Sequence, residues 1–144
     1  FNTSVMKSTV TTAKDNTLET NPDRALQGAS PWIINSDLKY DFDFKENWSN
    51  TLTLVYNVYG KRIYAIGTAG LDHYYEQSFN KLDFIWGSKV SKNWDLKLAI
   101  DNILDPMYQI KLGSENKVNI TEQDLTVKSY KRGIGFSFNL GYTF

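Results

Sequence analysis

The sequence predicts an all-β protein whose strands, about six in number, belong to an antiparallel transmembrane β-barrel. Apolar and polar side chains alternate along several segments of about ten residues. Short polar connections alternate with long ones along the chain. Aromatic residues make up 15% of the chain and gather near the ends of the predicted strands. Together these features are typical of strands that separate lipid from water.

The C-terminal segment has the most regular alternation. Within residues 133–144, from position 134 onward, every even position is apolar or aromatic, and every odd position is Gly, Ser, Asn or Thr. A period of two is the mark of a strand with two unlike faces. The same period predicts strands over residues 32–44, 51–60, 81–90 and 94–112.

Two of the predicted strands are less regular. Pro106 lies within the 94–112 segment, and because proline has no N–H to donate to a neighbouring strand, we expect a bulge or break there. Residues 1–12 are rich in β-forming residues, but their apolar and polar positions are not cleanly separated. We predict this segment as the first strand.

The connections between the predicted strands differ in length. Residues 45–50 and 91–93 form short polar connections, whereas residues 13–31, 61–80 and 113–132 form long ones. Outer-membrane barrels have short turns on the periplasmic side and long loops on the outside. The order of the connections then predicts a periplasmic C-terminus.

A soluble protein shares this period of two. In a β-sandwich, or in a lipocalin-like β-barrel that binds a small apolar ligand, the apolar face would be the core. The membrane interpretation is favoured by the aromatic residues near strand ends, by a polar face that mixes Gly, Ser, Asn, Asp and Lys, and by a final strand that ends on Phe144. The lipid-facing candidates are Leu54, Phe84, Leu98, Phe136 and Phe138.

About six strands are too few to close a barrel that spans lipid, since known single-chain barrels begin at about eight. An open edge in hydrocarbon would leave backbone N–H and C=O groups unpaired, each at a cost of several kcal/mol. The sequence begins at Phe1 without an initiator Met or a signal peptide. We therefore expect a piece of a longer protein, completed by earlier strands or by a partner chain.

The composition argues against several other classes of function. The chain has 16 basic and 16 acidic residues, so it lacks the basic excess of a nucleic-acid-binding protein. It has no Cys and one His, so we expect no metal site, no cofactor and no catalytic residues. The protein is predicted not to be an enzyme.

Four residues of the predicted 61–80 loop are candidates for ligand contact. They are Tyr64, His73, Tyr74 and Tyr75. Recognition is often carried by loops on a rigid scaffold, and aromatic side chains supply rigid contact area. The alternative is that these side chains pack against neighbouring loops.

Three segments resemble the C-terminal part of TonB-dependent outer-membrane receptors. Residues 102–108, Asn-Ile-Leu-Asp-Pro-Met-Tyr, are similar to the Asn-Leu-Phe-Asp-x-x-Tyr signature of the penultimate strand in that family, with one apolar residue replacing another at two positions. Residues 24–32 resemble the passage from a loop into a strand, and residues 130–144 resemble the last strand with its insertion signal. The motif residues are Asn102, Asp105 and Tyr108, and the assembly signal implied by the resemblance is Leu140, Tyr142 and Phe144.

The resemblance implies active transport across the cell outer membrane of a Gram-negative bacterium. The family has a barrel of about 22 strands around an N-terminal plug, and this chain would supply the C-terminal wall. The implied partners are outer-membrane lipid, the rest of the barrel and plug in the same or a partner chain, the TonB complex through an N-terminal region, the barrel assembly machinery and a surface lipoprotein. The alternative is a structural barrel that acts as a scaffold in a larger outer-membrane complex.

Overall fold

The computed structural model describes residues 1–12, 18–114, 118 and 125–144. In these residues the chain forms strands, turns and irregular connections, and every strand pairing is antiparallel. No helix within them is both long enough and apolar enough to cross a membrane. The predicted all-β, antiparallel architecture is therefore confirmed.

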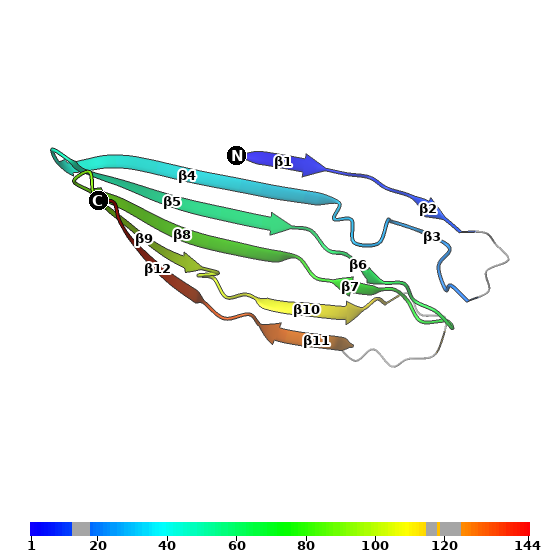
Figure 1. Ribbon diagram of the computed structural model, residues 1–144. Helices are drawn as coiled ribbons and strands as arrows, with labels where there is room; N and C mark the ends of the chain where they lie inside the picture. Colours follow the sequence, from blue (N-terminus) through cyan, green and yellow to red (C-terminus); the bar gives the residue numbers. More distant parts are fainter. Residues whose placement is uncertain (13–17, 115–117, 119–124) are drawn as a thin grey trace.

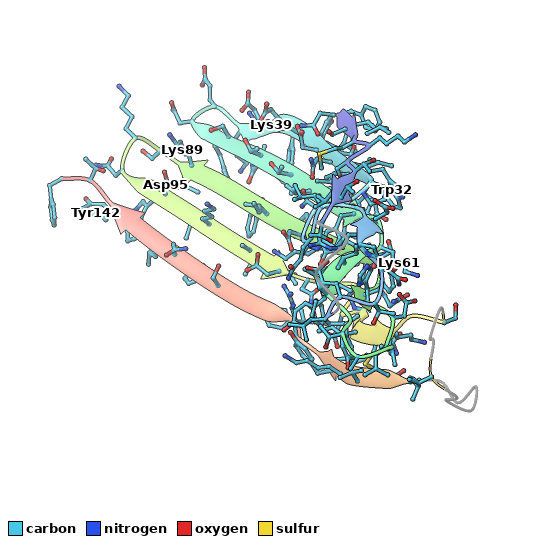
Figure 2. All side chains as sticks on the ribbon, turned by 90° about the vertical axis from the view of Figure 1, so that its right-hand side faces the viewer. Trp32, Lys39, Lys61, Lys89, Asp95 and Tyr142 are labelled. Atoms are coloured by element: carbon cyan, nitrogen blue, oxygen red, sulfur yellow. The ribbon has the colours of Figure 1, made fainter. Side chains whose placement is uncertain are left out.

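The largest element is an open six-stranded sheet (Figure 1). Its strands, in spatial order, are β1 (Asn2–Val5), β4 (Trp32–Lys45), β5 (Trp48–Tyr59), β8 (Phe79–Val90), β9 (Trp94–Asp101) and β12 (Gly135–Tyr142). Within the described residues β1 and β12 pair on one side only, so they are the two edges and the sheet does not close into a barrel. Figure 2 shows side chains standing on both faces of this sheet.

Two tight turns join strands at one end of the sheet, which we call the turn end. The turn between β4 and β5 contains Asn47, and the turn between β8 and β9 begins at Ser91. Both residues have positive φ angles, 68° and 59°, as tight connections between antiparallel strands require. The Ser91 N–H donates to the Asn47 carbonyl at 2.6 Å and links the two turns. The C-terminus also lies at this end (Figure 1).

A second sheet of four short strands continues the first beyond its other end (Figure 1). We call it the loop-end sheet. Its strands, in spatial order, are β11 (Thr126–Lys131), β10 (Met107–Leu112), β7 (Tyr74–Glu76) and β6 (Arg62–Ala65). These strands extend the lines of β12, β9, β8 and β5, respectively, after a break of a few residues in each.

The loop-end sheet corrects part of the strand prediction. The predicted loop 61–80 contains β6 and β7, and the predicted loop 113–132 contains β11. The predicted strand 94–112 is divided into β9 and β10 by residues 102–106, where the break at Pro106 was expected. Strands of three to six residues carry too few side chains for alternation to be visible.

The N-terminal part of the chain is also more divided than predicted. Residues 1–12 form β1 and a second short strand, β2 (Val10–Thr11), which pairs with β3 (Asp23–Arg24) inside the predicted loop 13–31. Residues 13–17, 115–117 and 119–124 of the predicted long loops lie outside the described residues.

The register of the six-stranded sheet sorts side chains by sequence parity. Even-numbered residues of β4, β5, β8, β9 and β12 are paired with even-numbered residues, so their side chains share one face, the even face. Two rows across this face are Leu38, Leu54, Phe84, Ile100, Phe136 and Tyr40, Leu52, Trp86, Leu98, Phe138. A row on the opposite, odd face is Asp41, Thr51, Gly87, Lys97, Asn139.

The buried core lies at the junction of the two sheets rather than under the six-stranded sheet. Phe79, Tyr108 and Ile110 form a buried cluster, against which Tyr59 and Tyr74 pack. The Phe79 ring lies 6.1 Å from that of Tyr59 and 6.0 Å from that of Tyr108, measured between centroids. The interior packing of the described chain is therefore concentrated near the loop-end sheet.

Candidate functional site

The first candidate functional surface is the even face of the six-stranded sheet. Several of its large apolar side chains are exposed, with Phe136 at 72% and Phe138 at 63% of full exposure, and Leu38 and Tyr40 are exposed to a similar degree. Soluble monomers rarely leave contiguous apolar patches larger than a few hundred Å² open to water. This face therefore requires a cover that the described residues do not supply.

Aromatic side chains form a band across the even face at the turn end. The Phe44 and Trp48 ring centroids are 5.4 Å apart, and those of Trp94 and Tyr142 are 4.8 Å apart. Tyr142 also contacts Phe144 edge to face, at 5.0 Å. Trp48, Trp94 and Tyr142 belong to one row of the register, through Val90. We call these five aromatic residues the aromatic band.

Two polar residues interrupt the even face beside the aromatic band. Asn50 and Ser88 are paired across β5 and β8 and are both buried. The Trp48 indole N–H donates to Ser88 Oγ at 2.9 Å, and the Trp86 indole N–H donates to Asn50 Oδ1 at 3.2 Å. Each indole ring thus donates a hydrogen bond to one member of this polar pair, which lies in the row Phe42, Asn50, Ser88, Leu96, Leu140.

The motif residues Asn102 and Asp105 form hydrogen bonds between the segment that follows β9 and the segment that precedes β12. Asn102 Nδ2 donates to the Gly133 carbonyl at 2.7 Å, and the Gly133 N–H donates to Asp105 Oδ1 at 2.9 Å. Asp83 Oδ1 accepts the Asn102 N–H at 2.8 Å from the neighbouring strand β8. The break after β9 and the break before β12 are therefore held together by side-chain to backbone hydrogen bonds.

Backbone conformation explains why these positions carry Asn, Asp and Gly. Asn102 and Asp105 have φ angles of 59° and 39°, and Gly133 has a φ angle of 84°. Among residues with a side chain, Asn and Asp tolerate the left-handed region best, and Gly adopts it freely. The third motif residue, Tyr108, lies in the buried core with its ring 4.9 Å from that of Tyr130.

A charged and aromatic cluster surrounds Glu76 in the loop-end sheet. Glu76 is only 4% exposed, and its carboxylate accepts hydrogen bonds from Tyr59 Oη at 2.6 Å and from Arg62 Nε at 2.7 Å. The Arg62 guanidinium lies over the Tyr59 ring, 4.5 Å from its centroid. Burial alone would raise the pKa of the Glu76 carboxyl, but the hydrogen bonds from Arg62 and Tyr59 outweigh it and hold that pKa below its ordinary value.

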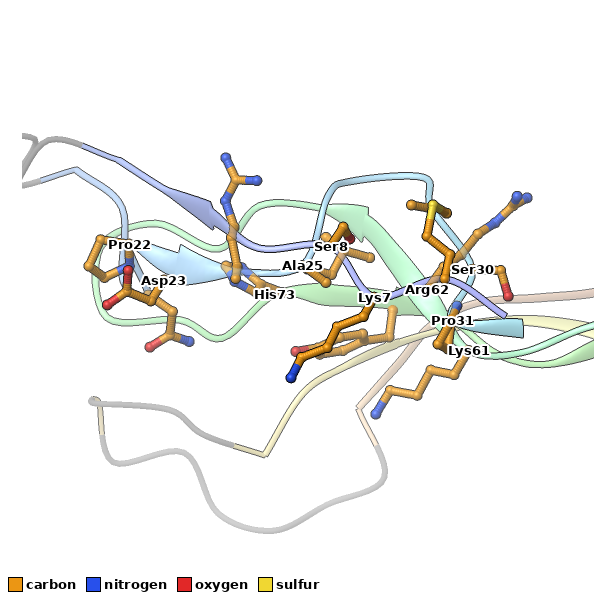
Figure 3. Close-up of a pocket in the computed structure, with 16 residues that line it drawn as sticks. Lys7, Ser8, Pro22, Asp23, Ala25, Ser30, Pro31, Lys61, Arg62 and His73 are labelled. Atoms are coloured by element: carbon orange, nitrogen blue, oxygen red, sulfur yellow. The ribbon is translucent and has the colours of Figure 1, made fainter. Parts of the chain in front are cut away.

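A cavity of about 740 Å³ lies between the N-terminal segment and the hairpin of β6 and β7 (Figure 3). Its lining combines residues from distant parts of the sequence. Those lining residues are Met6, Lys7, Ser8, Asn21, Pro22, Asp23, Arg24, Ala25, Ala29, Ser30, Pro31, Lys61, Arg62, Ile63, His73 and Tyr75. Cavities of this size are typical of small-molecule sites.

The structure separates the four predicted ligand-contact residues. His73 and Tyr75 line the cavity, but His73 is 2% exposed and its Nδ1 accepts the Gly67 N–H at 3.0 Å. Tyr74 packs against the buried core, as in the alternative interpretation, and Tyr64 is 49% exposed on β6, away from the cavity lining. Only Tyr75 combines partial exposure with a place in the cavity wall.

The residues of the implied assembly signal all lie on or next to the even face at its β12 edge. Leu140 and Tyr142 are paired with Leu96 and Trp94 of β9, and Phe144 follows the strand in the aromatic band. The side chains of Leu140, Tyr142 and Phe144 are all exposed.

The sequence does not predict the charged residues that line the cavity or form the Glu76 cluster in the loop-end sheet. Lys7, Lys61, Arg62 and Glu76 come from three separate segments, and no spacing in the sequence connects them. Within the described residues no three His, Asp or Glu side chains are grouped so that they could hold a metal ion. Comparison with protein-family models, curated proteins and solved structures finds no match to this chain.

Proposed function

We propose that this chain forms part of the wall of an outer-membrane β-barrel, with its even face against lipid. The observation that carries the proposal is the even face itself. Its rows of apolar side chains lie beside the aromatic band, and their exposed members are Leu38, Tyr40, Leu54, Phe136 and Phe138. In transmembrane barrels an apolar belt is flanked by aromatic residues at the level of the lipid headgroups.

The length of the strands is compatible with a membrane. β8 has 12 residues, so at about 3.4 Å per residue it is about 40 Å long. A tilt of about 40° projects this length onto about 30 Å, the thickness of the hydrocarbon core. In the proposed wall the turn end faces the periplasm, and the loop-end sheet stands outside the membrane.

The odd face is suited to a wet or plugged interior. Lys39 and Asp41 form an ion pair at 3.0 Å on this face, and Thr51 donates to Asp41 at 2.6 Å. The open edges of β1 and β12 would be completed by further strands of the same protein or of a partner chain, because unpaired backbone groups are costly in lipid.

The proposal predicts a large loss of stability for a substitution at one position of β12 and a small loss for the same substitution at the next position. Phe138→Arg places a charge on the even face near the middle of β12 and should destabilise the protein in a bilayer by about 2–4 kcal/mol. Asn139→Arg places the same charge on the odd face and should have little effect. The measurement is the unfolding free energy of the full-length protein in lipid vesicles, by denaturant titration.

The same pair of variants tests the soluble alternative. If the even face were the core of a water-soluble body, the wild-type protein would remain monomeric and unfold cooperatively without detergent. Equal stability of Phe138→Arg and Asn139→Arg in lipid vesicles would contradict the membrane proposal. Aggregation of the wild-type protein that detergent reverses would agree with it.

We further propose that the barrel is a TonB-dependent receptor that takes part in active transport. Support comes from the resemblance at residues 102–108, whose Asn102 and Asp105 have a defined structural task in joining the breaks at the loop end. The experiment is co-purification of the full-length protein with the periplasmic domain of TonB. Retention of TonB agrees with a receptor, whereas absence of retention favours a structural scaffold.

A further inference from the structure

We call the cavity between the N-terminal segment and the hairpin of β6 and β7 the loop cavity. One of its ends carries two lysine side chains. In Figure 3 the side chains of Lys7 and Lys61 extend to the same side of the cavity, whereas Arg62 points another way. Asp23, the one acidic residue of the described lining, lies at the opposite end beside Pro22 (Figure 3). The cavity therefore has a cationic end.

Backbone hydrogen bonds anchor the two segments that carry these exposed lysines. The residue before Lys7, Met6, donates its N–H to the Pro31 carbonyl at 2.9 Å. The residue before Lys61, Gly60, donates its N–H to the Trp32 carbonyl at 3.0 Å. A Cβ on Gly60 would approach the Trp32 ring to 2.5 Å, so the absence of a side chain there allows the two segments to pack closely.

The other cations of the cavity wall are paired, whereas the two lysines have no acidic partner among the described residues. Arg62 bonds to Glu76 at 2.7 Å, and Arg24 lies 3.7 Å from Glu19. Among the residues that the structure describes, no carboxylate lies within 4.0 Å of the ammonium group of Lys7 or Lys61. Lys61 instead lies over the Tyr75 ring, 4.1 Å from its centroid, which restricts its ammonium group.

We propose that this cavity binds a small molecule that carries an oxyanion, a carboxylate or a phosphate, between Lys7 and Lys61. An anion there would neutralise two like charges that face the same space. The body of the ligand would lie against the apolar wall formed by Met6, Pro31 and Ile63. The cavity lining includes no residue of the even-face rows, so the inference holds whether or not the even face lies in lipid.

The test is calorimetric titration of the full-length protein in detergent with citrate, inorganic phosphate and uncharged glycerol. We expect citrate or phosphate to bind and glycerol not to bind. Because hydrogen bonds to charged groups are among the stronger ones, Lys7→Gln and Lys61→Gln should each weaken anion binding about tenfold. Lys61→Arg, which keeps the charge, should retain most of the affinity. Which probe binds identifies the oxyanion.

The control is Lys89→Gln, an exposed lysine of β8 at the turn end, far from the cavity (Figure 2). It should bind the probe as the wild-type protein does. The proposal is overturned if neither anion binds at concentrations up to about 10 mM. It is also overturned if the Lys7→Gln, Lys61→Gln double variant binds with wild-type affinity, or if Lys89→Gln weakens binding equally.

Discussion

Asn102 offers the sharpest test of how the two sheets are joined. Asn102 is 5% exposed, its backbone is in the left-handed region, and its side chain donates to Gly133 at 2.7 Å. Replacement by Ala removes the hydrogen bond, which is worth about 1 kcal/mol. It also places a residue with lower tolerance at a positive φ, which adds about 1–2 kcal/mol. We expect Asn102→Ala to lower the unfolding free energy by about 2–3 kcal/mol in total.

Asn102→Gly separates the two contributions. Gly adopts the left-handed conformation without strain but cannot donate to Gly133, so its cost should be near the hydrogen bond alone, about 1 kcal/mol. Denaturant titration of the protein in detergent, followed by tryptophan fluorescence, gives the order wild type, Gly variant, Ala variant. If both variants unfold with the wild-type free energy, or if the Gly variant is less stable than the Ala variant, this reasoning is refuted.

Two more predictions concern buried polar contacts. Because the folded-state pKa of the Glu76 carboxyl lies below its ordinary value of 4.5, the stability that this carboxylate contributes is present above that pH and is lost as the pH falls through the depressed pKa. Glu76→Gln should therefore destabilise the protein at pH 7 and flatten the acid side of its stability profile. Equal acid sensitivity in both proteins would contradict this. Trp48→Phe leaves the buried Ser88 hydroxyl without its donor and should cost about 1 kcal/mol in thermal unfolding, whereas Ser88→Ala in that background should cost little more.

The long strands could be predicted from the sequence because alternation is a local property. β4, β5, β8 and β12 each have eight or more residues with two unlike faces, so the period of two is visible in each. The short strands could not be predicted in this way. β7 consists of Tyr-Tyr-Glu, and it is a strand because β6 and β10 pair with it on either side.

The candidate sites were predictable only in part for a related reason. The even face is predictable from alternation, because each long strand by itself already places its apolar residues at even positions. The loop cavity joins residues near positions 7, 25, 61 and 75, and their proximity depends on pairings that no local pattern encodes. Sequence position groups His73 and Tyr74 with Tyr75, but in the structure His73 is buried and Tyr74 packs against the buried core.

The position of the core is unusual, because loops generally lie on the surface and pack less closely than the strands that they connect. In the described chain the closely packed interior lies where the long strands meet the loop-end sheet, whereas the middle parts of the long strands mainly contact their neighbouring strands. A saturation mutagenesis survey should then find that the middle parts of the long strands, away from this junction, accept many replacements of similar polarity. Positions such as Phe79, Tyr108 and Ile110 should accept few, because side-chain shape is constrained there. Sequence changes in the loop-end sheet would therefore be restricted to positions outside this buried, mainly aromatic cluster.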